Sequence, residues 1–307
     1  MAEGTGMELK EHLKKRGVEK GISQIISLVA EQSKVVKRAF HTHNALSGTQ
    51  NVYGEQQLEL DKHADRVFTE ALRESGIVRT IASEEQGEIT EIEKAEGEFG
   101  VTLDPLDGSS CVDTNLSVGT IVGIFDEGDV LEKGGLMDAA CFVLYGPLTT
   151  LTYSAKDGVH EFAMDEKGEF VLRKENMQLP DGMIYSPGGL RGEWLPAHAR
   201  FIGELEKEKY KLRFSGSFAA DFNQILNYGG VFCYPATKGA PEGKLRLLFE
   251  ANPMAFIAAQ AGGASSNGVQ DILSIKPRSL AQRVPLYIGG KKEIQLAEKF
   301  VGGKKGK

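Results

Sequence analysis

The chain has 307 residues, of which 41% are hydrophobic and 26% charged, a composition typical of a globular protein in water. Its formal net charge is -7 and its one dense basic run is a short tail at 304–307, so we expect no nucleic-acid partner. No apolar run approaches the roughly 20 residues of a membrane span. The polar N-terminus also has no signal-peptide core, so we expect a cytoplasmic protein with no membrane partner.

The cysteines are too few and too scattered for a disulfide framework. They number 3, at Cys111, Cys141 and Cys233, with no zinc-site spacing between them. An odd number of distant cysteines fits a reducing compartment.

The first half of the chain predicts helices followed by a series of strands. Apolar residues near 3.6 spacing predict helices over residues 9–15 and 22–45, a loop over 48–54, and a third helix over 56–74. Short apolar runs then predict strands over 77–82, 99–103, 116–125, 139–145, 149–155, 159–164 and 169–172.

After a crossing segment at 176–182, strands and helices alternate. The strands are expected over 183–186, 211–214, 231–234, 244–249 and 285–288, and the helices over 196–208, 217–227, 250–261 and 291–301. This order predicts an N-terminal α+β half over 1–181 and a C-terminal α/β half over 182–307.

Two carboxylates stand close together where a buried strand is expected to end. The apolar run over 99–103 is followed by Asp104, and Pro105 cannot donate a further ladder hydrogen bond. Asp107 lies three residues on, across a tight turn, so both carboxylates can point at one spot. Carboxylate oxygens suit Mg²⁺. A strand followed by an aspartate-capped turn is the plainer alternative for this motif taken alone.

An anion site is expected directly beside these acids. Gly108 permits a positive φ or a close backbone approach. Ser109 and Ser110 offer N–H groups and hydroxyls where a helix could begin.

Two more expected strands also end in acid. The run over 77–82 leads to Glu84 and Glu85, and the run over 245–249 leads to Glu250. Carboxylates at the carboxyl ends of three strands are what a metal cluster at the edge of a sheet needs. On the helix over 56–74, Asp61 and Asp65 occupy a polar face that could equally be solvated and paired along the helix.

Three motifs together resemble the sugar bisphosphatases, the family of fructose-1,6- and sedoheptulose-1,7-bisphosphatases. They are Ser83-Glu-Glu85, Asp104-Pro-Leu-Asp-Gly-Ser-Ser110 and Gly243-Lys-Leu-Arg-Leu-Leu-Phe-Glu-Ala-Asn-Pro-Met254. The resemblance runs from about residue 56 to 300. It implies a layered α/β/α sandwich and hydrolysis of a phosphoric monoester in carbohydrate metabolism. A homo-oligomer, dimer or tetramer, is also implied.

The resemblance also implies roles for individual residues. Two or more Mg²⁺ ions, with Mn²⁺ as an alternative, would be held by Glu84, Asp104, the Leu106 carbonyl, Asp107 and Glu250. The catalytic set would be Asp65 and Glu85, acting on the attacking water, and Arg246 as a guanidinium on the phosphate. The 1-phosphate would lie against Gly108, Ser109 and Ser110, and the distal phosphate against Arg191, Arg213, Tyr234 and Lys244.

Local details of the C-terminal half favour one sugar within this family. The stretches Ser186-Pro-Gly-Gly-Leu-Arg191 and Lys211-Leu-Arg-Phe-Ser-Gly-Ser217 are similar to sedoheptulose enzymes. The expected reaction is therefore hydrolysis of the 1-phosphate of sedoheptulose 1,7-bisphosphate to sedoheptulose 7-phosphate. The alternatives are fructose-1,6-bisphosphatase, alone or as a second activity, and an inactive sugar-phosphate-binding regulator.

Overall fold

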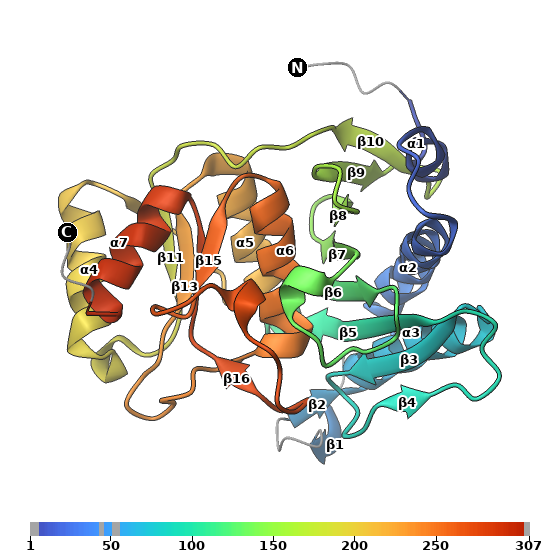
Figure 1. The fold of residues 1–307 in the computed structure, drawn as a ribbon, viewed down its shortest axis with the longest axis horizontal. Coiled ribbons are helices and arrows are strands. Elements are labelled where there is room, and N and C mark those ends of the chain that lie inside the picture. Colours follow the sequence, from blue (N-terminus) through green and yellow to red (C-terminus); the bar gives the residue numbers. More distant parts are fainter. Residues whose placement is uncertain (1–5, 43–45, 51–55, 304–307) are drawn as a thin grey trace.

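Five layers, alternating helix and sheet, make up the fold. The structure is a computed structural model that describes residues 6–42, 46–50 and 56–303. Figure 1 shows the layers in order across the molecule: one group of helices, a large sheet, two central helices, a smaller sheet and a last pair of helices. The layered α/β fold predicted from the sequence is thus present, with two sheets in place of one.

The larger sheet has eight strands in the order β10-β9-β8-β7-β6-β5-β3-β4, and only β3 and β5 are parallel neighbours. Its outer face is covered by α1 (Leu9–Lys15), α2 (Lys20–Ala39) and α3 (Glu59–Glu74). The strands are β3 (Val78–Ser83), β4 (Thr90–Glu91), β5 (Phe99–Asp107), β6 (Val118–Phe125), β7 (Ala139–Tyr145), β8 (Thr149–Ser154), β9 (His160–Met164) and β10 (Phe170–Lys174).

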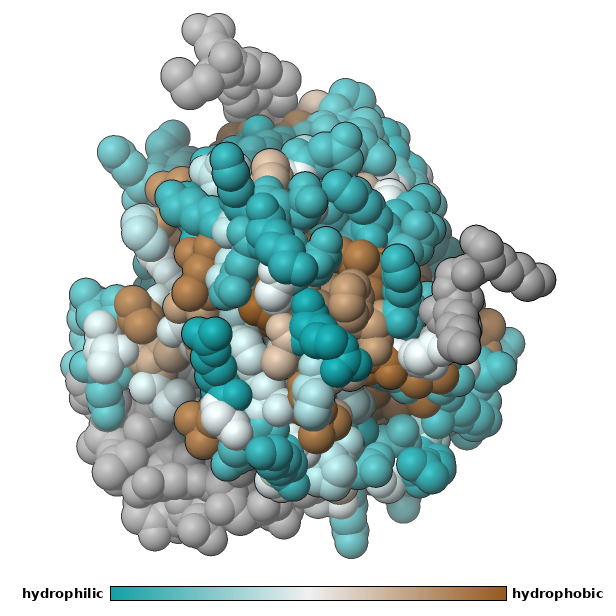
Figure 2. Space-filling model, turned by 90° about the vertical axis from the view of Figure 1, so that its left-hand side faces the viewer, coloured by the Kyte–Doolittle hydropathy of each residue, from teal (hydrophilic) through white to brown (hydrophobic). Residues whose placement is uncertain are grey.

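The smaller sheet has five strands in the order β12-β11-β13-β17-β15. They are β11 (Ile184–Pro187), β12 (Lys211–Leu212), β13 (Val231–Tyr234), β15 (Ala264–Ser266) and β17 (Leu286–Gly289). The helices α5 (Phe218–Tyr228) and α6 (Asn252–Gln260) lie between the two sheets, and α4 (Pro196–Lys207) and α7 (Lys291–Val301) cover the far side. Figure 2 looks onto this far side, where hydrophilic residues cover most of the surface.

Short elements complete the chain. Two further pairs of strands are β1 (Leu46–Gln50) with β2 (Gln56–Leu58), and β14 (Leu245–Arg246) with β16 (Arg283–Val284). The short helical turns are η1 (Ser109–Thr114), η2 (Gly134–Leu136), η3 (Arg191–Glu193), η4 (Leu247–Ala251) and η5 (Ile272–Ser274).

The strands are apolar on both faces because each sheet lies between two helical layers. Along β7, Cys141 and Val143 pack into the core beneath α2 and α3, whereas Ala140 and Phe142 pack into the central core. Side chains alternate between the faces of a sheet, so burial on both sides produces a continuous apolar run. The Phe142 ring lies 6.0 Å from that of Phe222 on α5, so both halves of the chain share the central core.

The longest helix described, α2, is amphipathic. Ile22, Ile25, Ile26 and Val29 are buried on one side, and the other side is exposed. Within the described part of the chain, no helix has both the length and the apolarity that crossing a membrane requires.

Some predicted boundaries differ from those of the structure. The helix expected over 22–45 ends at Ala39, and residues 43–45 lie outside the described part. The loop expected over 48–54 overlaps strand β1, and 51–55 are also outside. The strand expected over 244–249 is a strand only at Leu245–Arg246 and then becomes the π-helical turn η4. β15 has the sequence Ala-Ser-Ser and no strand pattern; pairing with β17 makes it a strand.

The buried histidine of α4 makes a pH prediction. His198 is buried, its Nδ1 lies 3.0 Å from the Tyr287 hydroxyl, and burial lowers its pKa to about 4. The unfolded chain binds this proton near the ordinary pKa of 6.5, so acid favours unfolding. We expect the free energy of unfolding to fall as the pH decreases from about 6.5 to 5, by up to about 1.4 kcal/mol per pH unit for each such histidine.

Denaturant unfolding at several pH values tests this, and His198→Gln is the comparison. In the variant, the free energy of unfolding should change less steeply with pH, because the contribution of His198 is gone. The contribution of the other buried histidines should stay. Equal slopes in both proteins would contradict the lowered pKa.

Candidate active site

A bulge in β5 turns its two aspartates toward the same side. In the antiparallel pairing of β5 with β6, Asp104 lies opposite Ile121 and Asp107 opposite Gly119. β5 thus advances three residues while β6 advances two. Positions three apart on a regular strand face opposite ways, and the extra residue of the bulge cancels this difference. Pro105, which has no N–H to donate, lies within the bulge, and its carbonyl accepts from Thr120 Oγ1 at 2.9 Å.

The neighbouring strand β3 brings two glutamates to the same edge. β3 and β5 are parallel, and Ser83 lies beside Leu103. The Glu84 N–H continues the ladder, donating to the Leu103 carbonyl at 2.9 Å. Glu84 and Glu85 therefore leave the sheet beside Asp104, as the sequence pattern predicted.

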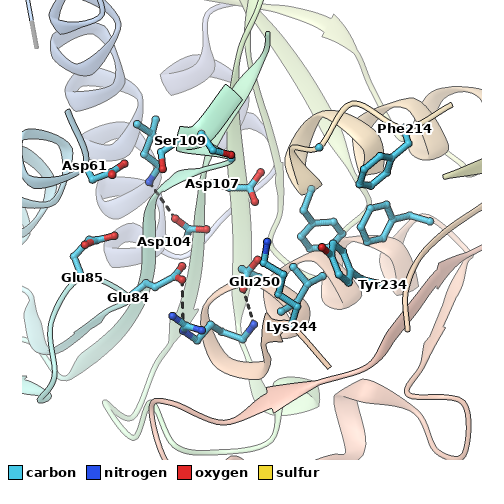
Figure 3. A pocket seen from close by; sticks show the side chains of 18 residues that line it. Asp61, Glu84, Glu85, Asp104, Asp107, Ser109, Phe214, Tyr234, Lys244 and Glu250 are labelled. Carbon is cyan, nitrogen blue, oxygen red and sulfur yellow. Dashed lines mark hydrogen bonds and ion pairs between the residues drawn. The ribbon is translucent and has the colours of Figure 1, made fainter. Parts of the chain in front are cut away.

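A buried arginine connects two of the acids. The Arg246 backbone N–H donates to Glu250 Oε2 at 2.5 Å, which bends the chain through the turn η4. Its side chain is 1% exposed, and its Nε lies 3.5 Å from Glu84 Oε1. Arg246 thus contacts Glu84 through its side chain and Glu250 through its backbone. Figure 3 shows the two acids.

The acids form a buried cluster with strongly perturbed titration. One oxygen each from Asp104, Asp107 and Glu250 lie within 4.8 Å of one another. Burial, and after it the negative charge of Glu84 and the other acids, raises the pKa of Asp104 well above its usual range. The pKa of Glu250 is raised well above its usual range by the same causes, and burial raises that of Asp107 to about 6.

This donor set fits hard divalent cations. All of its ligand atoms are carboxylate oxygens, and a cation would remove the repulsion that raises their pKa values. Hydrogen bonds already orient the oxygens: Asp104 Oδ1 accepts from the Leu106 N–H at 3.0 Å. Asp107 Oδ2 accepts from Ser217 Oγ at 2.9 Å and from the Ala219 N–H at 2.8 Å, at the start of α5.

The cluster lines one end of a cavity of about 370 Å³. Figure 3 shows Asp61, Glu84, Glu85 and Asp104 on one side of it and Tyr234 and Phe214 on the other, with Asp107, Glu250 and Lys244 between them. Gly108, Ser109 and Ser110 also line the cavity, with Ser109 near Asp61 and Asp104 in Figure 3. Gly108 has a φ of 76°, and a Cβ there would come within 2.6 Å of Ser217 Cβ, so only glycine fits without strain. Lys244 Nζ lies 5.6 Å from the centre of the Tyr234 ring.

Three residues expected in the site do not line this cavity. Asp65 instead accepts hydrogen bonds from Ser83 Oγ at 2.5 Å and from Gln86 Nε2 at 3.0 Å. Arg213 donates to Gln224 Oε1 at 3.2 Å. Arg191 is exposed at the start of η3.

Asp61 is the acid of α3 that lines the cavity. It is 3% exposed and lies beside Glu85 in Figure 3. Asp61, one helical turn before Asp65, thus lies at the position beside Glu85 that was expected of Asp65.

Comparison with known proteins places nearly the whole chain in one family. Residues 5–175 match the description "Fructose-1-6-bisphosphatase, N-terminal domain", and residues 179–302 match its C-terminal domain. A protein of Methanocorpusculum labreanum named fructose-1,6-bisphosphatase class 1 is 49% identical over 290 residues, which is 94% of this chain and 90% of the relative. A Geobacter sulfurreducens protein of the same name is 47% identical over 301 residues, 97% and 96% of the two chains.

Solved structures share the fold. Leishmania major fructose-1,6-bisphosphatase in its holo form has a TM-score of 0.91 and 31% identity, over 96% of this chain and 99% of that one. A provisionally named sedoheptulose-1,7 bisphosphatase from Toxoplasma gondii has a TM-score of 0.88 and 30% identity, over 97% and 99%.

The carboxylate cluster predicts that Mg²⁺ stabilises the folded protein. Added Mg²⁺ should raise the melting temperature of the wild type but not of Asp104→Asn. Without metal, the variant should melt above the wild type, because one buried charge and its repulsion are gone. Melting curves with Mg²⁺ or a chelator test both points. Asp65→Asn, outside the cavity, is the control that keeps the Mg²⁺ shift, and an equal shift in Asp104→Asn would refute the site.

Proposed function

This chain belongs to the fructose-1,6-bisphosphatase family and is a phosphatase of sugar bisphosphates, and on that premise we propose that it removes the 1-phosphate of fructose 1,6-bisphosphate. The observation that carries the proposal is the polarity of the cavity. Glu84, Glu85 and Asp104 gather toward one end, Tyr234 and Phe214 line the other, and Lys244 lies between Glu250 and Tyr234. A sugar with a phosphate at each end fits this arrangement if cations occupy the acidic end.

Hydrolysis of a phosphate monoester is extremely slow in water, so the site has to lower a high barrier. The reaction needs a positioned, activated water and stabilisation of charge on the phosphoryl and leaving oxygens. Mg²⁺ is the cation that we propose, with Mn²⁺ as an alternative, because the cluster offers oxygen ligands only. When bound, such ions supply charge neutralisation and an acidified water.

The protein's own residues then divide the remaining work. Glu85 and Asp61, at the edge of the cluster, are the proposed acceptors of the proton that the attacking water loses. Arg246 is the proposed positioning residue, since its side chain is buried against Glu84 and its N–H holds Glu250. Each metal-ligand position carries an acid, which favours an enzyme over an inactive sugar-phosphate-binding regulator.

The two phosphates are assigned to opposite ends of the cavity. Backbone N–H groups near Ser109 and Ser110, where η1 begins, are the proposed donors to the 1-phosphate. Lys244 is the proposed cation on the distal phosphate, and the Tyr234 hydroxyl a neutral donor. Arg191 and Arg213, expected there from the sequence, are outside the lining of the cavity and are not assigned to it.

Two observations favour fructose over the sedoheptulose sugar expected from the sequence. The relatives that are 43% to 49% identical over most of their length carry the name fructose-1,6-bisphosphatase. The argument for the longer sugar also depended on Arg191 meeting the distal phosphate, and this side chain is exposed outside the cavity lining.

Sedoheptulose 1,7-bisphosphate stays the second candidate because of the turn before Arg191. A Cβ on Gly188 would come within 2.4 Å of Tyr234 Cδ2, so this turn packs directly on a residue of the cavity wall. Its Gly-Gly sequence therefore shapes the distal end.

The expected homo-oligomer stays a prediction.

The assignment of the proton acceptors predicts a ranking among three variants. Glu85→Gln and Asp61→Asn keep shape but accept no proton, so kcat should fall by on the order of 10²-fold or more with KM little changed. Asp65→Asn, one turn along the same helix, should lose much less. Steady-state phosphate release measures all three. A larger loss in Asp65→Asn than in Asp61→Asn would return the role to Asp65.

The assignment of the distal cation predicts substrate preference. We expect a higher kcat/KM for fructose 1,6-bisphosphate than for sedoheptulose 1,7-bisphosphate. Lys244→Met should lower kcat/KM for fructose 1,6-bisphosphate by roughly ten- to a hundredfold, the cost of about 1.5–3 kcal/mol for a lost charged hydrogen bond. Arg191→Ala is the matched control and should change it little. A wild-type preference for the seven-carbon sugar, with a selective loss in Arg191→Ala, would favour the second candidate.

A further inference from the structure

A second cluster of metal-ligand side chains lies far from the active site on the larger sheet. It consists of His12 on α1, His160 at the start of β9 and Glu175 just after β10. Asp157, in the turn before β9, lies beside it, with Oδ1 3.8 Å from His160 Nε2. Strands β8, β7 and β6 separate β9 from β5, which carries the active-site aspartates. Both histidines are fully buried, with ring centres 4.6 Å apart. One ligand atom each of His12, His160 and Glu175 lie within 4.8 Å of one another.

Two buried polar atoms of this cluster have no hydrogen-bond partner. They are His160 Nε2 and Asp157 Oδ1, which lie 3.8 Å apart. Buried polar atoms are rarely left unpaired, because each forfeits its interaction with water. A bound ion or a water molecule between these two atoms would satisfy both.

Two of the distances between ligand atoms are close to those around a small tetrahedral ion. Bonds of 2.0–2.1 Å place neighbouring ligand atoms of a tetrahedral Zn²⁺ site about 3.3 Å apart. His12 Nε2 is 3.2 Å from Glu175 Oε1, and His160 Nε2 is 3.8 Å from Asp157 Oδ1. A contraction of a few tenths of an ångström would bring the second pair to this value.

The proton of the His12 ring is compatible with metal binding through Nε2, whereas the proton of the His160 ring has to leave Nε2 for metal to bind there. His12 Nδ1 lies 2.8 Å from the Tyr153 hydroxyl. A hydroxyl can donate or accept, so Nδ1–H can donate to it while Nε2 binds metal, the usual arrangement for a metal-bound histidine. His160 Nδ1 accepts from the Asn176 N–H at 3.3 Å. Binding through Nε2 moves this ring's proton to Nδ1 and ends that long contact.

The charges of the cluster also favour a cation. Arg16 Nε donates to Asp157 Oδ2 at 2.7 Å, which leaves Oδ1 for the site, and its guanidinium lies 3.8 Å from Glu175. The guanidinium and the two carboxylates sum to one negative charge before a divalent ion binds.

We propose that His12, His160, Glu175 and Asp157 form a Zn²⁺ site. Two imidazoles with two carboxylates suit Zn²⁺, whereas the all-oxygen active site suits Mg²⁺. Glu175 is 37% exposed and provides the entry path. The bound ion connects α1 to β9 and to the segment that leads into the second half of the chain. Its role is structural, because ligands from three separate elements meet only in the folded protein.

The test counts Zn²⁺ per chain in protein whose active-site cluster is weakened by Asp104→Asn. Chelator-stripped protein is dialysed against Zn²⁺ with excess Mg²⁺, and bound metal is measured by mass spectrometry alongside the melting temperature. We expect one Zn²⁺ per chain and a higher melting temperature with Zn²⁺. Glu175→Gln, at a partly exposed position that does not threaten folding, should weaken binding strongly. Tyr153→Phe should weaken it by roughly 10- to 100-fold.

His198→Gln is the matched control. His198 is also buried and also lies beside a tyrosine hydroxyl, but it is not among the described residues that form a metal-ligand group. This variant should bind Zn²⁺ as the parent does. No bound Zn²⁺ in the parent, or equal binding in Glu175→Gln, would overturn the proposal and leave a water molecule as the bridge between His160 and Asp157.

Discussion

Repulsion among buried carboxylates is the constraint on which the rest of the site depends. Asp104, Asp107 and Glu250 are withdrawn from water and held within 4.8 Å of one another, and their pKa values rise as a result. Each unit of such a shift is about 1.4 kcal/mol of unfavourable free energy for the charged form. The surrounding fold must supply that energy, and it does so with donors aimed at the acids: N–H groups at the start of α5, the Ser217 hydroxyl, and Arg246.

The five-layer arrangement explains why the donors can be so placed. Asp107 leaves the larger sheet and meets the N-terminus of α5, a helix of the central layer, so one hydrogen-bonded contact joins the two halves next to the site. A helix N-terminus stabilises a nearby anion through its free N–H groups and dipole. The central core around Phe142 and Phe222 holds these layers in register. The contacts that stabilise the fold here therefore also fix the geometry of the site.

Much of the site was predictable because acids at strand ends are a local signal. Asp104, Asp107, Glu84, Glu85 and Glu250 follow apolar runs, and all five line one cavity. The choice between Asp61 and Asp65 was not local. Both lie on the polar face of α3, and only the packing of that helix on β3 and β5 turns Asp65 toward Ser83 and Asp61 toward the cavity. Arg191 at the start of η3 and Arg213 just after β12 show the same limit, because no local pattern indicates that they are outside the lining of the cavity.

The sequence by itself determined the elements and most of their chemistry. Strands such as β7 are buried on both faces and therefore appear in the sequence as continuous apolar runs. Helices such as α2 appear as apolar residues spaced about 3.6 apart. Both signals come from residues that are close together in the sequence. Tertiary structure alone decided how Asp104 and Asp107 come to face one way, since the bulge exists only in the pairing of β5 with β6. It also decided that the chain after Arg246 turns as a π-helix, and that His12 and His160, 148 positions apart in the sequence, share one buried space. These features depend on contacts between distant segments, which no local pattern records.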